Sequence, residues 1–320
     1  MTTPQTPIRS GFGPSSTAAD VIQGIDLAGM TAIVTGGYSG LGLVTTEALA
    51  AAGATVVVPV RNMAKARDAL GEHPRIELAE MDLSDSMSIA AFAQRFLETG
   101  RALPILINSA GVMATPLLRD ADGHEGQFAT NHLGHYRLTC ALWPALAAKG
   151  ARVVAVSSRG HQIAPVDFGD IDFRDRAYDK WQAYGQSKTA NALFARAPDK
   201  RGAVHGVRAF SLHPGQILTD LARHLSAEEL AGFDAFDANG LPKIDPELGM
   251  KTPEQGAATS LWCATSPSLV GLGGVYCEDC DVASIHSGEL GRKGVAAWAA
   301  DDIAAERLWA LSAEWTGLTV

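Results

Sequence analysis

Tyr184 and Lys188 are the two side chains whose types and spacing best suit proton chemistry. They lie four residues apart in a segment with helical spacing, so we expect them on one face of a helix. A free tyrosine has a pKa of about 10 and is a poor base at neutral pH, but a nearby ammonium favours the phenolate and lowers that pKa. Such a tyrosine can pass a proton to or from an alcohol or ketone oxygen. Because this spacing often arises by chance, its weight depends on the surrounding fold.

Two serines, Ser157 and Ser158, end an apolar segment with the composition of a β-strand. Ligands bind beyond the carboxyl ends of strands in open α/β sheets, and a serine there can hydrogen-bond a substrate oxygen as charge develops on it. For either serine alone, a helix cap or turn is an equal alternative.

A glycine-rich segment, Gly36-Gly37-Tyr38-Ser39-Gly40-Leu41-Gly42, follows the β-branched run Thr31–Thr35 and precedes a helical pattern. Glycines allow backbone N–H groups to approach a pyrophosphate, and the dipole of the following helix favours its negative charge. Glycine spacing alone is a weak signal. Between a strand and a helix, at the start of a series of such units, it predicts a nucleotide site.

The end of the second expected strand, Thr55–Val60, indicates which dinucleotide binds. Sites that prefer NAD carry an acidic residue there for the ribose 2′-hydroxyl. This chain has Arg61 and Asn62 instead. Because a guanidinium can pair bidentately with a 2′-phosphate, the sequence predicts NADP(H) over NAD(H). The alternative is that Arg61 is a solvated charge at the start of a helix.

The elements that must position these groups alternate along the chain. Strand-length apolar runs followed by helical segments predict βαβ units and a parallel sheet covered on both faces. We expect a single doubly wound, Rossmann-type, three-layer α/β/α domain over residues 28–320, after an N-terminal arm, 1–27. The other expected strands are Ile76–Ala79, Ile105–Ile107, Arg152–Val156, Val207–Leu212 and Gly274–Cys277, and the expected helices include Gly42–Ala52, Met87–Glu98, Gly126–Ala148 and Tyr184–Ala197.

Two stretches, near 160–181 and 220–253, interrupt the alternation and are expected as insertions over the active site, with surface elaboration as the alternative. Pro198 should end or kink the preceding helix near Ala197. Aromatic residues in both insertions suggest an apolar or aromatic ligand, although they can equally serve loop packing. They are Phe168, Phe173, Tyr178, Trp181, Phe233 and Phe236.

Net charge and cysteine content argue against some classes of protein. A net charge of −9 argues against a nucleic-acid partner, which would require a basic face. Four cysteines in 320 residues suggest a reducing compartment without a disulfide framework. Cys277 and Cys280 form a C-x-x-C without a second pair, so inert packed thiols are favoured over a redox pair or zinc site. His132 and His135 lack a third ligand, and we predict no metal.

Membrane and export signals are also missing from the sequence pattern. No apolar run reaches the length of about 18 residues that a membrane span requires. The first twenty residues are rich in Thr, Ser, Pro and Gly and do not have the pattern of a secretory signal. We therefore expect a cytoplasmic protein that acts on a small molecule, as a monomer or homodimer.

Together these motifs resemble the short-chain dehydrogenase/reductase superfamily over about residues 28–280. The glycine turn matches the family's cofactor turn, and Tyr184 with Lys188 matches its Y-x-x-x-K. Ser158 falls on the catalytic serine and Asn131 on the helix asparagine. The contexts N-H-L-G-H, V-S-S-x-G-H and Y-x-Q-S-K-x-A-N resemble the retinol-dehydrogenase-like and protochlorophyllide-reductase-like branch, which usually prefers NADPH.

The resemblance implies a role for each matched residue. Asn131 would hold a water that relays protons through Lys188 and the ribose hydroxyls, and Ser158 would polarise the carbonyl. Asp82 would touch the adenine edge, and Thr219 would bind the carboxamide. The implied cofactor-binding residues are Gly36, Tyr38, Ser39, Gly40, Leu41, Gly42, Arg61, Asn62, Asp82, Leu83, Asn108, Ser109, Ala110, Gly111, Pro214, Gly215, Ile217 and Thr219.

The sequence thus predicts an NADP-dependent oxidoreductase that transfers a hydride between nicotinamide and a carbonyl or secondary alcohol. Tyr184 would be the acid in reduction and the base in oxidation. A non-catalytic NADP-binding sensor is one alternative, and a Tyr184→Phe variant with unchanged turnover would favour it. A reductase of carbon–carbon or imine double bonds is another, which product analysis would distinguish.

Overall fold

The computed structural model describes residues 3–232, 236–237, 240–286, 288 and 290–320. Eight strands form one sheet in the order β3-β2-β1-β4-β5-β6-β7-β8, with every neighbouring pair parallel except β7 and β8. This order confirms the doubly wound arrangement. The strands are β1 (Thr31–Val34), β2 (Thr55–Val60), β3 (Ile76–Glu80), β4 (Ile105–Asn108), β5 (Ala151–Val156), β6 (Val207–His213), β7 (Val275–Glu278) and β8 (Asp281–Val282).

The strands are buried on both faces because successive side chains point to opposite sides of the sheet. In β1, Ala32 and Val34 belong to one core cluster and Ile33 belongs to the other. The same division separates Val56 from Val57 in β2. A sequence with apolar residues at consecutive strand positions therefore requires a layer of helices on each face.

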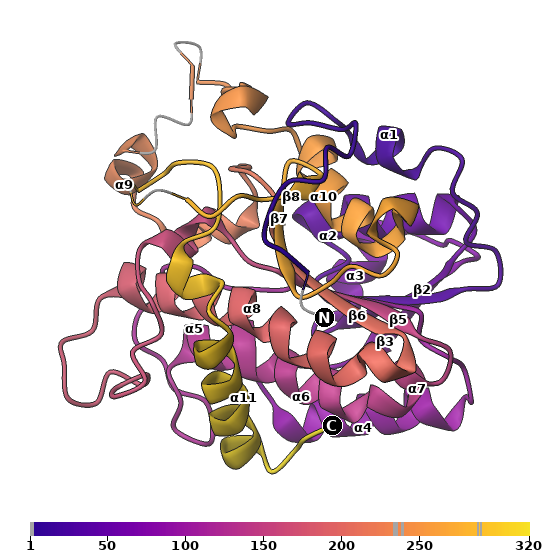
Figure 1. Ribbon diagram of the computed structural model, residues 1–320, viewed down its shortest axis with the longest axis horizontal. Helices are drawn as coiled ribbons and strands as arrows, with labels where there is room; N and C mark the ends of the chain where they lie inside the picture. The colour runs from indigo at the N-terminus through magenta and orange to yellow at the C-terminus, as the bar shows by residue number, and fades with distance from the viewer. Residues whose placement is uncertain (1–2, 233–235, 238–239, 287, 289) are drawn as a thin grey trace.

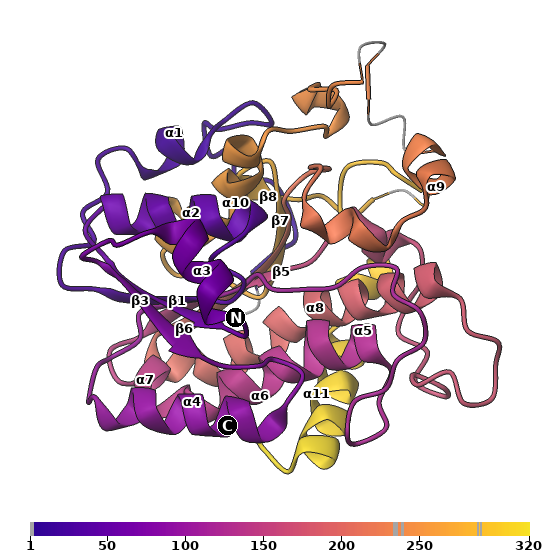
Figure 2. The same cartoon turned by 180° about the vertical axis from the view of Figure 1, so that it is seen from behind.

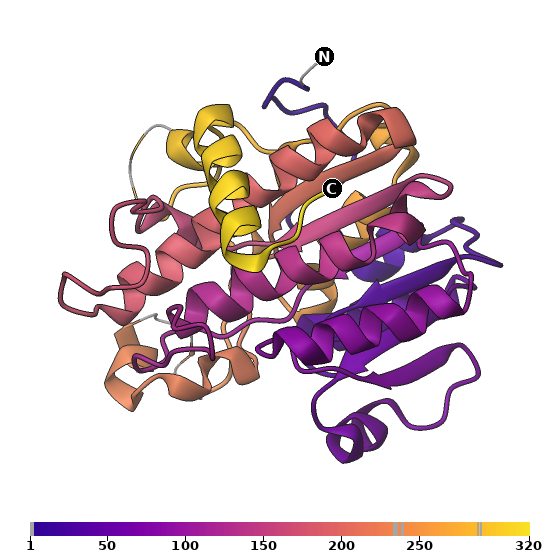
Figure 3. The ribbon, with the colours of Figure 1, turned by 90° about the horizontal axis from the view of Figure 1, so that it is seen from below.

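Helices supply these two layers (Figures 1 and 2). One face is covered by α1 (Ala18–Ile22), α2 (Gly40–Ala51), α3 (Met63–Leu70) and α10 (Pro253–Thr265). The opposite face, seen from below in Figure 3, is covered by α4 (Ser86–Glu98), α6 (Gly134–Ala141), α7 (Trp143–Ala147), α8 (Lys180–Gly202) and α11 (Asp302–Thr316). No helix in the described ranges is both long and apolar enough to cross a membrane.

The order of the strands determines where a ligand can enter. β1 pairs with β2 on one side and with β4 on the other, so the connections that leave β1 and β4 run in opposite directions. A crevice opens beyond the carboxyl ends of the strands at such a reversal. The glycine turn after β1 and the loop after β4 meet at this point, because Thr35 bonds the backbone N–H groups of Ser109 and Ala110.

The segment expected as one helix over Gly126–Ala148 is divided in the structure. A short α5 (Gly126–Phe128) leads into a π-helical turn, Ala129–Leu133, and then into α6. Leu142 separates α6 from α7, and Pro144 stands in the first turn of α7. Proline lacks an N–H group and is tolerated in a first turn, which explains the restart there.

Of the two outcomes expected for Pro198, an end or a kink of the helix near Ala197, the first is wrong. α8 continues to Gly202 because its last turns are held by tertiary contacts. Asp199 accepts hydrogen bonds from Arg208 Nε at 2.8 Å and from Ala209 N at 3.0 Å, both on the neighbouring β6. These bonds to the sheet offset the local cost of the proline.

The C-x-x-C segment forms a tight hairpin between β7 and β8. Its two central residues, Asp279 and Cys280, have φ values of 53° and 59°, as a two-residue hairpin turn requires. Cys277 and Cys280 are both free and buried in the apolar core. Burial raises the pKa of the Cys280 thiol to about 12, so the favoured interpretation as inert packed thiols agrees with the structure.

The N-terminal arm packs along the edge of the sheet formed by β7 and β8 (Figure 1). Gln5 donates to the carbonyl oxygens of Tyr276 and Ala283 and accepts from Tyr276 N. The Asp281 carboxylate accepts the backbone N–H groups of Ile8 and Arg9. These contacts cover an edge that would otherwise present unpaired backbone groups.

Replacing Asp199 with alanine should destabilise the fold by about 3 kcal/mol, because it leaves the guanidinium of Arg208 unpaired where both side chains are largely buried. Urea unfolding measures this loss. Asp302→Ala is the matched control, since Asp302 also pairs with an arginine, Arg196, but its side chain is 60% exposed. That variant should lose at most about 1 kcal/mol. Equal losses in the two variants would contradict the assigned role of Asp199.

Candidate functional site

A cleft of about 820 Å³ lies at the carboxyl ends of β1 to β6. The residues expected to bind cofactor or substrate converge on it from segments far apart in the sequence. Of those residues, only Asn108 and Asn131 do not line the cleft; both are buried behind its wall. Those that do line it are Gly36, Tyr38, Ser39, Gly40, Leu41, Gly42, Arg61, Asn62, Asp82, Leu83, Ser109, Ala110, Gly111, Ser158, Tyr184, Lys188, Pro214, Gly215, Ile217 and Thr219.

The glycine turn makes a cradle that side chains would fill. A Cβ on Gly42 would lie 2.3 Å from the carbonyl oxygen of Gly36, and one on Gly37 would lie 2.5 Å from Thr46 Oγ1. Gly36 and Gly40 have φ values of 68° and 50°, which favour glycine. The backbone therefore stays uncovered at the N-terminus of α2, as binding of a pyrophosphate requires.

The hydroxyl of Thr35 joins this turn to the loop after β4. Its Oγ1 accepts hydrogen bonds from Ser109 N at 2.9 Å and Ala110 N at 3.0 Å. The same oxygen lies 2.9 Å from His135 Nε2, while His135 Nδ1 lies 2.9 Å from the carbonyl oxygen of Asn131. Since that carbonyl can only accept, Nδ1 carries the proton and Thr35 donates to Nε2.

Asn131 lies in the π-helical turn, and its side chain is fully engaged. Its Oδ1 accepts from Val112 N at 2.8 Å, and its Nδ2 donates to the carbonyl oxygen of Val112 and to Ser187 Oγ. The amide therefore fixes the loop after β4 against α8. A water relay at this residue would have to use its backbone carbonyl oxygen, which already accepts from His135.

Tyr184, Ser158 and Lys188 meet at the inner end of the cleft. Burial raises the pKa of Tyr184 to about 12, opposed by a hydrogen bond with Ser158. Lys188 Nζ lies 5.7 Å from the centre of the Tyr184 ring and is not the group that lowers this pKa. The structure thus differs from the expected effect of Lys188, because desolvation of the phenolate outweighs attraction to an ammonium at that distance.

Lys188 is itself buried, and desolvation lowers its pKa to about 8. Its Nζ donates to the carbonyl oxygen of Val156 at 3.1 Å, at the end of β5. Ser157 Oγ donates to the backbone carbonyl oxygen of Lys188 at 2.6 Å, so Ser157 serves the backbone of α8. Ser158 Oγ faces the cleft and accepts from Gly160 N.

Arg61 and Asn62 lie at the outer end of the cleft, after β2. Arg61 is exposed, and Asn62 caps α3 by accepting from Lys65 N. Lys65 also lines the cleft and forms an ion pair of 3.1 Å with Asp220. Lys65 is not among the residues named from the sequence, although a second cation in the first turn of the helix that follows Arg61 was a usable signal.

The second insertion contributes directly to the cleft. Thr219 lies against the glycine turn, since a Cβ on Gly40 would approach its Cγ2 to 3.3 Å. Asp220, Leu221 and Arg223 line the cleft in the next turn. Further along, Phe236 is 40% exposed, and Phe233 lies outside the described residues.

The first insertion mainly packs elsewhere. Phe168 packs near α11, Phe173 is buried beneath Arg176, and Tyr178 donates to the carbonyl oxygen of Thr115. Only Trp181 approaches the reacting groups, with its ring centre 6.4 Å from that of Tyr184. The first three aromatics therefore give no support for an aromatic ligand.

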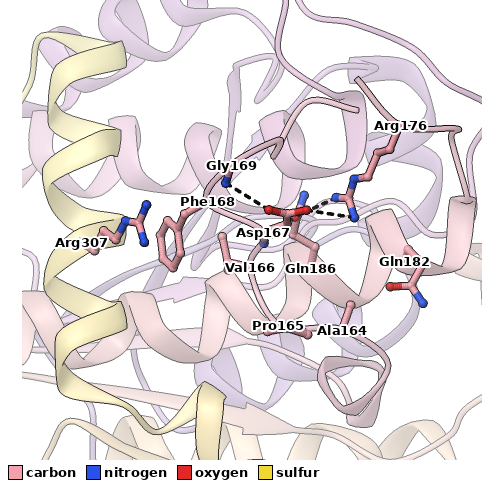
Figure 4. A pocket seen from close by; sticks show the side chains of 10 residues that line it. All are labelled: Ala164, Pro165, Val166, Asp167, Phe168, Gly169, Arg176, Gln182, Gln186 and Arg307. Atoms are coloured by element: carbon pink, nitrogen blue, oxygen red, sulfur yellow. Dashed lines mark hydrogen bonds and ion pairs between the residues drawn. The ribbon is translucent and has the colours of Figure 1, made fainter. Parts of the chain in front are cut away.

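Part of this insertion forms a separate hollow against α8 and α11 (Figure 4). Arg176 lies 3.4 Å from Asp167, and Gln186 accepts from Asp167 N, so these polar groups bond to one another. Arg307 stacks over the ring of Phe168 at 4.4 Å. None of the candidate catalytic residues lines this hollow.

The histidines considered as metal ligands are packed residues. His132 Nε2 bonds to Ser312 Oγ at 2.8 Å, and His135 bonds to Thr35 and Asn131. Within the described ranges, no group of three potential ligands is placed to hold a metal ion.

Comparisons with known proteins agree with this architecture. The family model described as short chain dehydrogenase matches residues 30–230. A Streptomyces antibioticus protein described as a "Probable oxidoreductase" is 45% identical over 294 residues, covering 89% of this chain and 97% of that protein. Human retinol dehydrogenase 12 is 37% identical over 303 residues, covering 92% of this chain and 88% of that protein. A crystal structure of an uncharacterised Mycobacterium paratuberculosis protein, 33% identical, has a TM-score of 0.71 and covers 95% of this chain and 98% of that one.

The doubly wound sheet, the glycine cradle and the cleft beyond the strand ends define an oxidoreductase class that uses a nicotinamide cofactor. The chain belongs to the short-chain dehydrogenase family. Its similarity to retinol dehydrogenase 12 supports the retinol-dehydrogenase-like branch that the motifs indicated.

The buried histidines predict a loss of stability in mild acid. Burial lowers the folded-state pKa of His132 to about 3, of His135 and His161 to about 4, and of His213 well below its usual value. The unfolded chain binds more protons below pH ~6.5, so the free energy of unfolding should fall as the pH decreases from 7.5 to 5.5. Each histidine should contribute about 1 kcal/mol at pH 5.5.

Urea unfolding at the two pH values measures this dependence. Burial raises the pKa of Glu125, so this carboxyl works in the opposite direction, and Glu125→Gln should steepen the loss of stability. Unfolding free energies that are equal at pH 7.5 and 5.5 would contradict the neutral state of the histidines in the folded protein.

Proposed function

We propose that this protein is an NADP-dependent oxidoreductase that transfers a hydride between nicotinamide and a carbonyl or secondary alcohol. The observation that carries the proposal is the convergence of Tyr184, Ser158 and Lys188 at one end of a cleft whose other walls include the glycine cradle. Tyr184 and Lys188 come from α8, and Ser158 comes from the loop after β5, so two separate elements bring these groups to one place.

The cleft is suited to a dinucleotide. The uncovered backbone at Gly36 and Gly42 would hold the pyrophosphate, and Thr219 lies against the same turn. The outer end carries two cations, Arg61 and Lys65, which favour a 2′-phosphate over a free hydroxyl. The nicotinamide, when bound, supplies or accepts the hydride.

Tyr184 would provide the proton. Because burial raises its pKa to about 12, the phenol is protonated at neutral pH and suited to act as an acid in carbonyl reduction. When a substrate oxygen takes the place of the Ser158–Tyr184 hydrogen bond, the Ser158 hydroxyl would donate to that oxygen as negative charge develops on it. Asn131 would hold the loop after β4 and the helix of Lys188 at a fixed separation.

An apolar substrate is supported by the outer wall of the cleft. Leu118, which is 60% exposed, and Leu221 line it together with Val112. Exposed leucines at the mouth of a cleft gain free energy when a ligand covers them. The proposal of an apolar substrate therefore rests on these cleft residues and not on the aromatic residues of the first insertion.

Replacing Tyr184 with phenylalanine should lower kcat by at least about 100-fold, the usual contribution of a positioned acid, and leave NADPH affinity within about twofold. Steady-state kinetics with bulky apolar ketones and aldehydes, together with NADPH titration, measure both. Tyr136→Phe is the matched control, because its hydroxyl donates to Leu318 away from the cleft. Unchanged turnover in Tyr184→Phe would favour the non-catalytic sensor instead.

Replacing Arg61 with alanine should raise the KM for NADPH by about 10-fold or more, since a charge-assisted hydrogen bond is worth about 1.5–3 kcal/mol. The KM for NADH should stay nearly constant, because NADH lacks the 2′-phosphate. Arg67→Ala removes an exposed arginine of the following helix, α3, that does not line the cleft, and should change neither value. Equal KM values for NADPH and NADH in the unaltered protein would refute the cofactor assignment.

A further inference from the structure

A single peptide group, between Ser158 and Arg159, is held at both ends by histidine side chains. The carbonyl oxygen of Ser158 lies 2.7 Å from His161 Nδ1. The backbone N–H of Arg159 donates to His213 Nδ1 at 3.0 Å. This peptide follows β5 directly and carries the serine proposed to polarise the substrate.

The surroundings of each ring determine its tautomer. His161 Nε2 accepts from the backbone N–H of Ala296 at 3.0 Å, so this nitrogen carries no proton. Nδ1 is then the protonated nitrogen and donates to the Ser158 carbonyl. Tyr276 Oη, 3.3 Å from the same Nδ1, completes the contacts of the ring nitrogens. For His213, the N–H of Arg159 likewise requires an unprotonated Nδ1.

Both rings are shielded from water, His161 at 0% and His213 at 5% exposure. His161 is also fixed through its backbone, since its carbonyl oxygen accepts from Thr189 Oγ1 and Trp298 Nε1. The Ser158 carbonyl oxygen accepts from the backbone N–H of His161 at 3.0 Å as well as from the ring at 2.7 Å, so the ring of fixed tautomer adds a second, shorter bond that sets its direction. Rotation of the Ser158–Arg159 peptide would break a buried hydrogen bond at each end. Because water does not reach these groups, no replacement bond would offset the loss.

We infer that His161 and His213 are positioning residues, which fix the Ser158–Arg159 peptide so that the Ser158 hydroxyl keeps its direction toward the substrate oxygen. The inference rests on the proposed function, because it gives these histidines a role through Ser158. It also makes the segment around Ala296, more than 130 residues away in sequence, part of the support of the active site.

Two substitutions of His161 remove its two ring hydrogen bonds, to Ser158 and to Ala296, one at a time. His161→Asn can place an amide N–H near the position of Nδ1, so it keeps the donor to Ser158 and loses the acceptor for Ala296. His161→Gln can place an oxygen near the position of Nε2, so it keeps the link to Ala296 and loses the donor to Ser158. The matched control is Gln162→Ala, since Gln162 donates to Arg292 and Gly294 in the C-terminal segment without contacting Ser158.

Each variant is made with Ser158 intact and in a Ser158→Ala background, and kcat, KM for NADPH and thermal midpoint are measured. We expect His161→Gln to lower kcat about 10-fold or more when Ser158 is present and by less than about twofold when it is absent. The KM for NADPH should not change. His161→Asn should keep most of kcat, and Gln162→Ala should lower only the thermal midpoint.

Equal effects of His161→Gln in both backgrounds would show a structural role only and would overturn the inference. If Ser158→Ala itself kept full activity, the serine's place in the proposed function would fail instead, which is a distinct result. Should His161→Gln not fold, His213→Asn and His213→Leu test the same peptide from its N–H end. His213→Asn keeps an acceptor near the position of Nδ1 and should retain kcat. His213→Leu has no acceptor, and it should lower kcat only when Ser158 is present.

Discussion

The hydroxyl of Thr35 is the contact on which the candidate site depends. It sits where β1 ends, accepts the N–H groups of Ser109 and Ala110 from the loop after β4, and donates to His135. His135 in turn bonds the carbonyl oxygen of Asn131. Through this one oxygen, the glycine turn, the second loop of the crevice and the π-helical turn are held at fixed separations. A crevice at a topological reversal has no strand running across it, so such side-chain bonds must define its shape.

Desolvation sets the chemistry of the inner end of the cleft. The same burial that keeps Tyr184 protonated lowers the pKa of Lys188 to about 8 and keeps His161 and His135 neutral. Neutral histidines can offer one donor and one acceptor in a fixed arrangement: His161 bonds two backbone groups, and His135 bonds the carbonyl oxygen of Asn131 and the hydroxyl of Thr35. Uncharged hydrogen bonds therefore support the side chains proposed to be catalytic, and such bonds keep their strength away from water.

The sequence predicted the strands to within one residue at most ends, because a parallel sheet covered on both faces demands consecutive apolar residues. Nearly every candidate residue that it named lines one common cleft, since glycine spacing and strand ends carry that information locally. It missed the continuation of α8 through Pro198, where the bonds from Asp199 to β6 outweigh a local preference. It also assigned Tyr184 a pKa lowered by Lys188, because spacing along a helix reports neighbours but not burial.

By itself, the sequence determined the fold class, the seven parallel strands and the set of groups able to do chemistry, because these follow from local periodicity and residue type. Only the tertiary structure decided that the Ser157 hydroxyl bonds to the backbone of Lys188, that Lys65 joins Arg61 at the outer end of the cleft, and that the first insertion packs mainly away from the cleft. It also decided the burial that raises the pKa of Tyr184 and lowers that of Lys188. Burial and long-range hydrogen bonds join residues that are distant in the chain, and no local pattern encodes them.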